Sequence, residues 1–334
     1  MICISKRRLI EMERVISPTK LIACYVIISI IFIGCVSISG TLPELQPSPT
    51  SQEPPKTPSK YPKHYKDGRI EIGENIFFYA SFGSSGKNFT QFDNPQDIAV
   101  DKDGYLYVAD TGNHRIQKFT SQGDFVGIIG TNTLVFSPSS LTIDNEGKMY
   151  VIDTDNLIKL SPQGEILRTI RINDPKGIAV EGNNLYITGE NKILCFDSSL
   201  LNLKWTLSNN YEDWNPFGIA VRQGYIYVTD IKNNRVCQIL KRGNSSSWIW
   251  SVQGILNKPL GIAVNDNYIY VADTHNHRIW LFEKGLDKIA NFGAQGNALG
   301  EFNNPSKIAV KENRIYVVDT GNCRIQIFEF FVDL

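Results

Sequence analysis

Six segments of this chain repeat one pattern, and this repetition limits the fold more than any other feature. Each segment begins with a proline, followed by an apolar triplet such as Ile98-Ala99-Val100, a turn, a Tyr-x-[Val/Ile] motif and a second apolar run. The aligned prolines, 37 to 46 residues apart, are Pro95, Pro138, Pro175, Pro216, Pro259 and Pro305. A period of about 40 residues is typical of repeat architectures in which each unit packs against its neighbours.

Each repeat unit consists of short strands alone. Val, Ile, Tyr and Phe alternate with smaller or polar residues in short runs, and turn sequences such as DKDG at residues 101–104 separate them. In the triplets, bulky Ile98 and Val100 point to one face and small Ala99 to the other, so that neighbouring inner strands interlock. We therefore predict an all-β fold, a six-bladed β-propeller with four-stranded blades.

A seventh, partial segment predicts how the ring closes. Residues 77–95 and 287–305 share Phe, Gly, Gly, Phe, Asn and Pro at matching offsets. Residues 76–82 therefore read as a fourth strand without a blade of its own. We expect this N-terminal strand to pair near residues 324–330 and to complete the last blade, because an unpaired strand edge favours aggregation.

The N-terminal residues 1–40 have the composition of an export signal or a membrane anchor. Five Lys or Arg residues precede an uncharged apolar run at residues 21–40, which is long enough to cross a bilayer once as a helix. The sequence FIGC at residues 32–35 resembles a lipoprotein cleavage box, which makes Cys35 a lipidation candidate. An uncleaved transmembrane anchor is the alternative. Both predict a membrane-anchored, extracytoplasmic protein at the cell surface or in the periplasm.

The composition changes twice more along the chain. Residues 41–70 are rich in proline and polar residues and predict a disordered linker, and residues 71–334 contain the predicted propeller. Residues 67–334 hold 25 Lys or Arg and 30 Asp or Glu. This acidic balance, together with the export signal, argues against a nucleic-acid partner.

The repeats resemble the NHL repeat, on segments such as NPQDIAVDKDGYLYVADTGNHRIQKF at residues 94–119. The resemblance covers roughly residues 76–331 and implies a six-bladed ring used mostly for binding. It also implies that some relatives are extracytoplasmic lyases or lactonases holding a metal at the mouth of the central channel.

The turn after Tyr-x-[Val/Ile] contains polar residues that invite a metal-site interpretation. Asp273, His275 and His277 lie within five residues, and an Asp precedes an Arg by five residues in four repeats, as in the pairs ending at Arg115 and Arg278. The His position holds Asn234 and Cys323 in other repeats, so a ligand role does not recur around the ring. We interpret these residues mainly as structural. As candidates for ligand binding on the loop face we keep Asp273, His275, His277, Arg115 and Arg278.

Repeats two and three depart from the pattern. The interval from Tyr150 to Leu160, and from Tyr186 to Phe196, is ten residues, against twelve elsewhere. We call the loops that lead into the aligned prolines the proline loops. The shorter turns predict a low rim on the face of the ring that carries these loops, and a groove could form at this rim. Neutral variation in loop length is the alternative. Trp214 and Tyr211 lie in a proline loop of the same face and could anchor a ligand, although packing of Trp214 on its own blade explains it equally well.

The sequence thus predicts a tethered, monomeric binding module for a protein, peptide or glycan. No catalytic constellation is present, and no metal ligands or cofactor are predicted, although Ca²⁺ or another divalent ion at the channel mouth is compatible with the Asp and Asn residues. The alternative is a metal-dependent lyase or lactonase-like hydrolase. Asn88 and Asn244 stand in glycosylation sequons.

Overall fold

The computed structural model describes residues 63–64, 70–73, 75–129, 137–208, 213–242, 245–252 and 254–331. The chain divides into two compact units, Met1–Pro54 and Pro55–Leu334, and all described residues belong to the second. The predicted signal or anchor, with Cys35, lies outside the described residues, as do Tyr211 and Asn244. Among the described residues, no helix is long and apolar enough to span a membrane.

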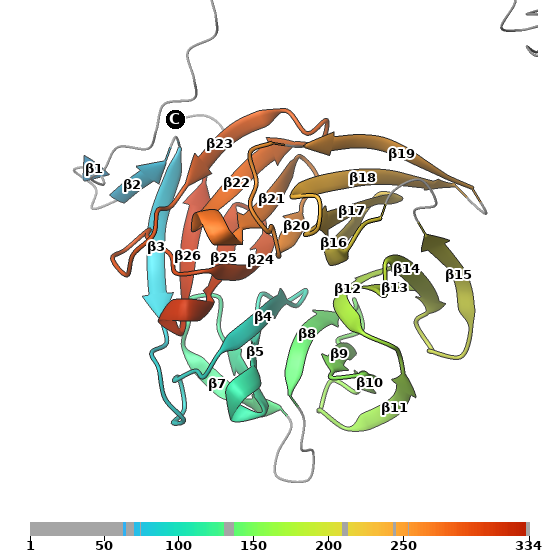
Figure 1. The fold of residues 1–334 in the computed structure, drawn as a ribbon. Coiled ribbons are helices and arrows are strands. Elements are labelled where there is room, and N and C mark those ends of the chain that lie inside the picture. The colour runs from blue at the N-terminus through green and yellow to red at the C-terminus, as the bar shows by residue number, and fades with distance from the viewer. Residues whose placement is uncertain are drawn as a thin grey trace, which may run out of the picture. The chain divides into compact units, whose positions relative to one another are not determined.

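Six antiparallel sheets form the blades of a β-propeller (Figure 1). Blade one contains β4 (Pro95–Val100), β5 (Leu106–Asp110), β6 (Arg115–Phe119) and β7 (Phe125–Ile129). Blade two contains β8 (Pro138–Ile143), β9 (Met149–Asp153), β10 (Asn156–Leu160) and β11 (Ile166–Arg171). Blade three contains β12 (Pro175–Glu181), β13 (Asn184–Gly189), β14 (Lys192–Asp197) and β15 (Leu203–Ser208).

The next two blades follow the same order. Blade four contains β16 (Pro216–Arg222), β17 (Tyr225–Asp230), β18 (Arg235–Arg242) and β19 (Ser245–Val252). Blade five contains β20 (Ile262–Val264), β21 (Tyr268–Asp273), β22 (Arg278–Glu283) and β23 (Lys288–Phe292). In the described ranges the only helical segments are the 3-10 turns η1 (Thr111–Asn113), η2 (Thr274–Asn276) and η3 (Thr320–Asn322). The predicted all-β, six-bladed fold is confirmed.

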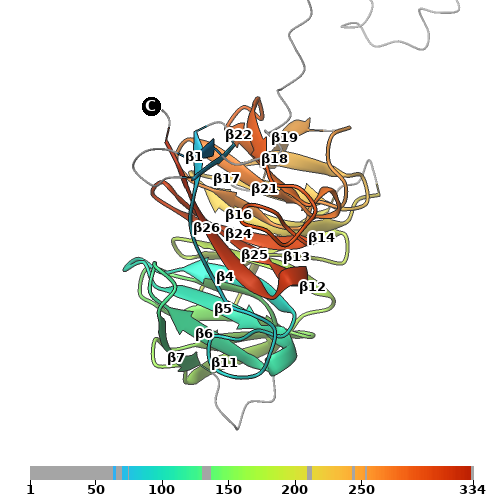
Figure 2. The ribbon, with the colours of Figure 1, turned by 90° about the vertical axis from the view of Figure 1, so that its left-hand side faces the viewer.

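Blade six differs from the expectation. It contains β24 (Pro305–Lys311), β25 (Arg314–Asp319) and β26 (Arg324–Phe330), followed in space by β3 (Ile76–Phe82), β2 (Ile70–Gly73) and β1 (Lys63–His64). β3 pairs with β26 in antiparallel register, from Ile325 opposite Phe82 to Phe330 opposite Ile76. The prediction of one N-terminal strand completing a four-stranded blade is wrong, because β2 and β1 extend this sheet to six strands. Figure 1 labels these strands, and Figure 2 shows β1 and β26 from the side.

The extra strands also correct the predicted linker. His64, assigned to the disordered segment 41–70, lies in β1 opposite Ile70 of β2. The proline-rich composition obscured this short hairpin, because a two-residue strand carries no measurable alternation.

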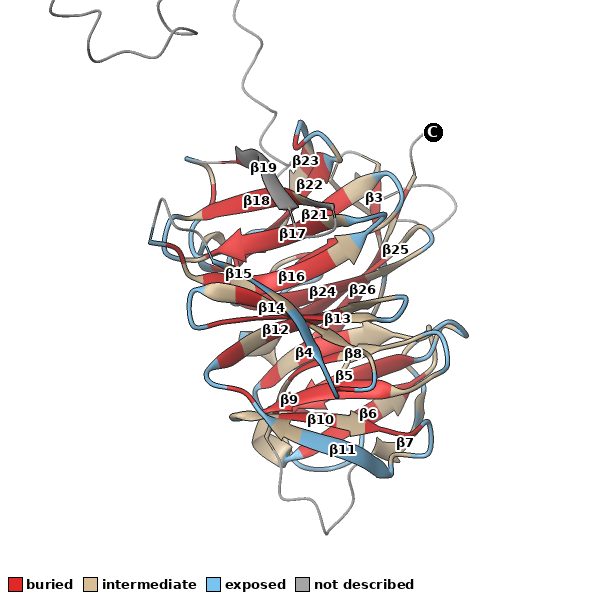
Figure 3. Cartoon of the chain, turned by 90° about the vertical axis from the view of Figure 1, so that its right-hand side faces the viewer, coloured by how far each residue is buried: buried red, intermediate tan, exposed pale blue. Residues whose placement is uncertain are grey.

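The core consists of layers between adjacent blades. One apolar cluster joins blades five and six, around Phe292, Ile308 and Phe328, and equivalent clusters lie between the other neighbours. Ala263 packs toward blade six whereas Ile262 packs toward blade four, which is the predicted bulky-and-small alternation. Figure 3 shows this buried interior and the exposed outer strand β11.

Three glycines let inner strands approach one another. The second residue after the proline is Gly177, Gly218 or Gly261 in blades three to five. A Cβ atom on Gly218 would lie 2.1 Å from the carbonyl oxygen of Leu260 in the next blade, and one on Gly177 would lie 2.3 Å from that of Phe217. Only glycine fits at these contacts without backbone movement.

Candidate binding site on the proline-loop face

The aspartate that ends the second strand in blades one, four, five and six is a structural hub. Asp273 is fully buried and accepts hydrogen bonds from the backbone N–H of Asn257 at 2.7 Å, from the side-chain amide of Asn276 and from Arg278 Nε at 2.8 Å. The same set recurs around Asp110, Asp230 and Asp319. We call this arrangement the Asp latch, because it fixes the second hairpin to the preceding proline loop.

The arginines complete the Asp latch. Arg115 donates to the carbonyl oxygens of Lys87, Asn88 and Gln91, and Arg278 donates to that of Ile255. Buried Arg side chains that pair with a carboxylate and cap loop carbonyls fix a backbone conformation. Arg115, Arg278 and Asp273 therefore serve the fold, as the repeat pattern indicates.

The histidines lie at corners between blades. His114 and His277 both adopt left-handed backbone conformations, with φ of 55° and 53°. His277 Nδ1 accepts the backbone N–H of Asn304 at 3.1 Å, and Asn234 Oδ1 accepts that of Lys258 at 2.7 Å in the equivalent corner of blade four. His275 is exposed beside this turn. Within the described residues, no three His, Cys, Asp or Glu side chains are grouped to hold one metal ion.

Trp214 is not an exposed anchor, so that interpretation is wrong. Its side chain is 1% exposed and packs with Tyr186 and Ile219 between blades three and four. The indole N–H donates to the carbonyl oxygen of Asn191 at 2.6 Å. Blade three lacks the Asp latch, and Trp214 of the next blade covers its short hairpin instead. The absence of Asp and Arg from repeat three was the signal that a neighbour supplies this packing.

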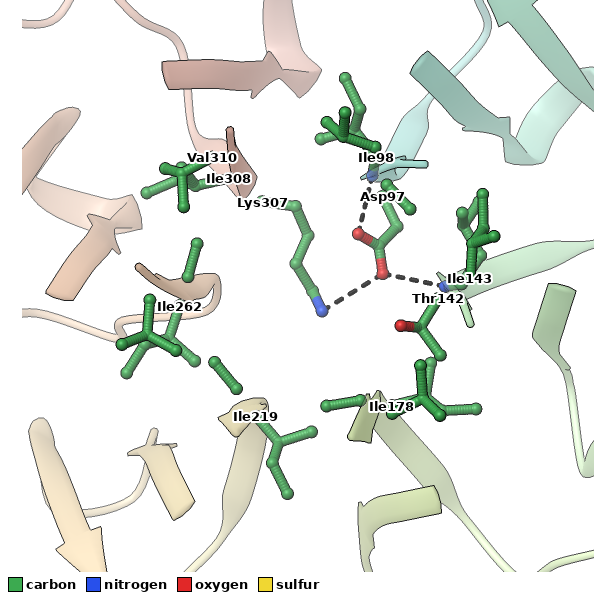
Figure 4. Close-up of a pocket in the computed structure, with 18 of the residues that line it drawn as sticks. Asp97, Ile98, Thr142, Ile143, Ile178, Ile219, Ile262, Lys307, Ile308 and Val310 are labelled. Atoms are coloured by element: carbon green, nitrogen blue, oxygen red, sulfur yellow. Dashed lines mark hydrogen bonds and ion pairs between the residues drawn. The ribbon is translucent and has the colours of Figure 1, made fainter. Parts of the chain in front are cut away.

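The central channel is lined mainly by aliphatic side chains, and two charged side chains lie at its proline-loop end. A cavity of about 190 Å³ is lined by the inner-strand triplets of all six blades, including Ile178, Ile219 and Ile262. Figure 4 shows these aliphatic side chains around the channel, with Asp97 and Lys307 pointing toward each other from blades one and six.

Asp97 and Lys307 form a buried network that the sequence analysis missed. Lys307 Nζ lies 3.3 Å from Asp97 Oδ2 and 3.4 Å from Ser140 Oγ. The Asp97 carboxylate also accepts Ser140 Oγ–H at 2.5 Å and the backbone N–H groups of Ile98 and Leu141. A divalent ion at this mouth therefore has to compete with the Lys307 ammonium. Aligning the repeats reveals the signal, because these charges replace glycines of blades three to five.

Above this network, the proline-loop face contains a second cavity, of about 360 Å³, which we call the face pocket. Each blade contributes the residue directly after its aligned proline. These residues are Gln96, Ser139, Lys176, Phe217, Leu260 and Ser306. Lys307 lines both the face pocket and the channel, so the two cavities lie next to each other at this side chain.

The wall of the face pocket is lowest at blades two and three. Two-residue turns join β9 to β10 and β13 to β14, where Asp153 faces Asn156 and Gly189 faces Lys192. The other four blades have four residues there. Thr154, Asp155 and Asp174 line the pocket on this side, so the two short turns border the face pocket.

The charged residues of the low rim are paired with one another. Asp155 lies 3.3 Å from Arg171 Nη2, and Asp174 forms an ion pair with Lys176. Asn88, the described sequon residue, is exposed in the loop before Pro95, and its carbonyl oxygen accepts Arg115 Nη2–H.

Comparison with a family model identifies NHL repeats at residues 92–119, 256–282 and 302–328, in blades one, five and six. The B-box type zinc finger protein ncl-1 of Caenorhabditis elegans is 40% identical over 52 residues, covering 16% of this chain and 6% of that protein. The E3 ubiquitin-protein ligase TRIM71 of Rattus norvegicus is 42% identical over 60 residues, covering 18% of this chain and 7% of that protein. The match thus spans less than a tenth of these relatives.

Solved structures share the fold over most of the chain. Virginiamycin B lyase from Staphylococcus aureus has a TM-score of 0.55 and 13% identity, covering 81% of this chain and 94% of that one. A streptogramin B lyase has a TM-score of 0.54 and 16% identity, with 76% and 89% covered. The β-propeller domain of Myceliophteria thermophila Cps50 (Swd1) has a TM-score of 0.54 and 9% identity, covering 74% of this chain and 100% of that one. At these identities the likeness concerns the fold alone.

Proposed function

We propose that this chain, an NHL-repeat six-bladed β-propeller, is a binding module that takes its ligand in the face pocket. The observation that carries the proposal is the pocket itself. It has the size of a small ligand site and combines an apolar side, from Phe217 and Leu260, with convergent polar groups. Ligand sites typically have this mixture, and loops on a repeat scaffold commonly carry them.

We further propose that the propeller acts as a monomer, tethered outside the cytoplasm, and recognises a protein, peptide or glycan there. The support is the sequence of residues 1–40, with its basic start and apolar run. A nucleic-acid partner is not proposed, because the net charge of residues 67–334 is negative.

Catalysis by a metal-dependent lyase or hydrolase is the weaker alternative. Its support is a fold shared with two lyases at 13% and 16% identity, which carries no argument about chemistry. A catalytic zinc or related ion needs about three protein ligands, and the described His114 and His277 are bound to neighbouring loops instead. Metal analysis of the purified full-length chain tests this alternative, since a stoichiometric ion resisting dialysis would favour it.

Arrays of peptides and of glycans test the binding proposal. The full-length chain is compared with Phe217→Ala/Leu260→Ala, which removes the apolar side of the face pocket. The matched control is Phe89→Ala/Leu299→Ala, which removes two exposed side chains that do not line the pocket. We expect the pocket variant to lose at least about tenfold in affinity and the control to bind normally. Equal loss in both variants, or in neither, would contradict the proposal.

A further inference from the structure

We infer that the face pocket binds the terminal residue of a neutral saccharide chain. The inference rests on the proposed binding function and adds the class of ligand. It follows from the charge balance of the pocket, from the distribution of its apolar and polar side chains, and from its opening on one side.

Every charged side chain that lines the face pocket already has a partner of opposite charge. Lys307 pairs with Asp97, Lys176 with Asp174, and Asp155 with Arg171. A charged ligand would lose its hydration without meeting an unpaired counter-charge. A neutral ligand avoids this cost.

The apolar and polar side chains of the face pocket lie on different sides. Phe217 and Leu260 come from blades four and five, whereas Ser306, Gln96 and Ser139 come from blades six, one and two. Blade three, at the low rim, contributes Pro175 together with the charged Asp174 and Lys176. A pyranose ring has a matching division, since its C–H face is apolar and its edge carries hydroxyl groups. The Phe217 ring can support the C–H face by apolar contact.

The polar side and the rim offer both donors and acceptors, as hydroxyl groups require. Asp155 and Asp174 carry carboxylate acceptors, and Ser139 and Thr154 carry hydroxyls that can donate and accept. Lys307 is 93% buried, its relative exposure being 7%, and its two described oxygen contacts of 3.3 and 3.4 Å are longer than usual N–H···O hydrogen bonds. The ammonium therefore retains donor capacity toward an oxygen in the pocket.

The shape of the rim favours the end of a chain over its middle. Blades two and three alone have the two-residue turns, so the face pocket opens over one side, past Asp155 and Asp174. A peptide end carries a charged amine or carboxylate, whereas the non-reducing end of a glycan built from neutral sugars carries no charge. The neutral pocket with one opening thus suits a glycan end better than a peptide end.

Titration calorimetry on the full-length chain tests the inference. The probes are the methyl glycosides of glucose, galactose, mannose and N-acetylglucosamine, the disaccharides lactose and cellobiose, and methyl glucuronide as the anionic comparison. The variants are Phe217→Ala and Asp174→Asn, with Phe89→Ala as the control. We expect at least one neutral sugar to bind more tightly than the glucuronide. Phe217→Ala should weaken its binding about tenfold or more, Asp174→Asn should weaken it too, and the control should not.

Other outcomes separate the inference from the proposed function. If no sugar binds while pocket-dependent peptide binding appears on the arrays, the saccharide inference fails and the binding function stands. If neither class shows pocket-dependent binding, both fail. Tighter binding of the glucuronide would overturn the argument from charge balance. Should Phe217→Ala not fold, as judged by circular dichroism, the exposed Asp174→Asn exchange decides alone.

Discussion

At the scale of single residues, clustered polar side chains in this propeller stabilise its turns. Asp273, His275 and His277 resemble a metal-binding triplet in the sequence. In the structure, however, Asp273 accepts the hydrogen bond of Arg278 within an Asp latch, and His277 accepts one from Asn304 of the next blade. The left-handed φ of His277 explains why Asn234 fills the same corner in blade four, since His and Asn tolerate this conformation better than most residues. Residue types that are common in metal and active sites, such as Asp and His, can thus recur in repeated turns for reasons of backbone geometry.

The Asp latch predicts a large stability effect for Asp273→Ala. The exchange leaves Arg278 and two backbone or amide donors without their buried acceptor, so we expect a loss of roughly 3–5 kcal/mol in the free energy of unfolding. Chemical denaturation measures this. Asp266→Ala is the control, because Asp266 pairs with Arg222 at the exposed surface and should leave stability close to wild type. Equal stability of both variants would refute the structural role of the Asp latch.

The tyrosine in the second strand of each blade predicts alkaline instability. Burial is the largest cause that raises the pKa of all six phenols, and it raises the pKa of Tyr186 to about 12. In the unfolded chain these groups ionise near pH 10. Because the folded pKa is the higher one, the stabilisation is complete below about pH 10 and decreases as the pH rises toward the folded values.

Urea unfolding midpoints at several pH values measure this effect. We expect the midpoint to fall steadily between about pH 10 and about pH 12. Replacing Tyr186 by Phe should lessen the decrease. A midpoint that stays constant across this range would contradict the buried, neutral state of the phenols.

At the scale of elements, the blades differ where the repeat pattern breaks. The two-residue turns of blades two and three lower the rim of the face pocket, and the glycines of blades three to five bring inner strands together. The sequence predicts strands and turns well, because each repeat confirms the others. It predicts contacts between blades poorly, because Trp214 and the Asp97–Lys307 pair depend on which residues meet across a blade boundary. The β1–β2 hairpin has no repeat to reveal it.

Gly218→Ala tests the close approach of inner strands. The new methyl group would lie 2.1 Å from the carbonyl oxygen of Leu260, so the backbone has to move, and we expect a loss of about 1–3 kcal/mol in unfolding free energy. Gly127→Ala in β7 is the matched control, because a Cβ atom there meets nothing within 4 Å. Its stability should equal or slightly exceed that of wild type. A neutral Gly218→Ala variant would show that the inner strands are not constrained as described.

At the scale of the whole molecule, the ring brings distant parts of the chain together. β3 pairs with β26, and Asp97 of blade one reaches Lys307 of blade six. The number of blades could be predicted because one aligned proline opens each of the six repeats. The face pocket could not, since it requires the side chains that follow those prolines to be placed around one axis.

The proposed tether predicts that the full-length chain sediments with membranes and resists extraction by salt. Deleting residues 1–40 should release it, because the apolar run at residues 21–40 is removed. Cys35→Ala distinguishes the two forms of attachment. Loss of an incorporated radiolabelled fatty acid indicates a lipoprotein, and an unlabelled wild type that stays in the membrane indicates an uncleaved anchor. Full-length chain in the soluble fraction would contradict the proposed location.

Hydrogen–deuterium exchange with a ligand selected on the arrays tests the central claim, that the face pocket is the binding site. The account predicts slower exchange in the proline loops around residues 174–176, 217 and 260 and in the short turn at residues 154–155. Protection confined to the exposed outer strands β11 and β15, or to the turn of His275, would contradict it.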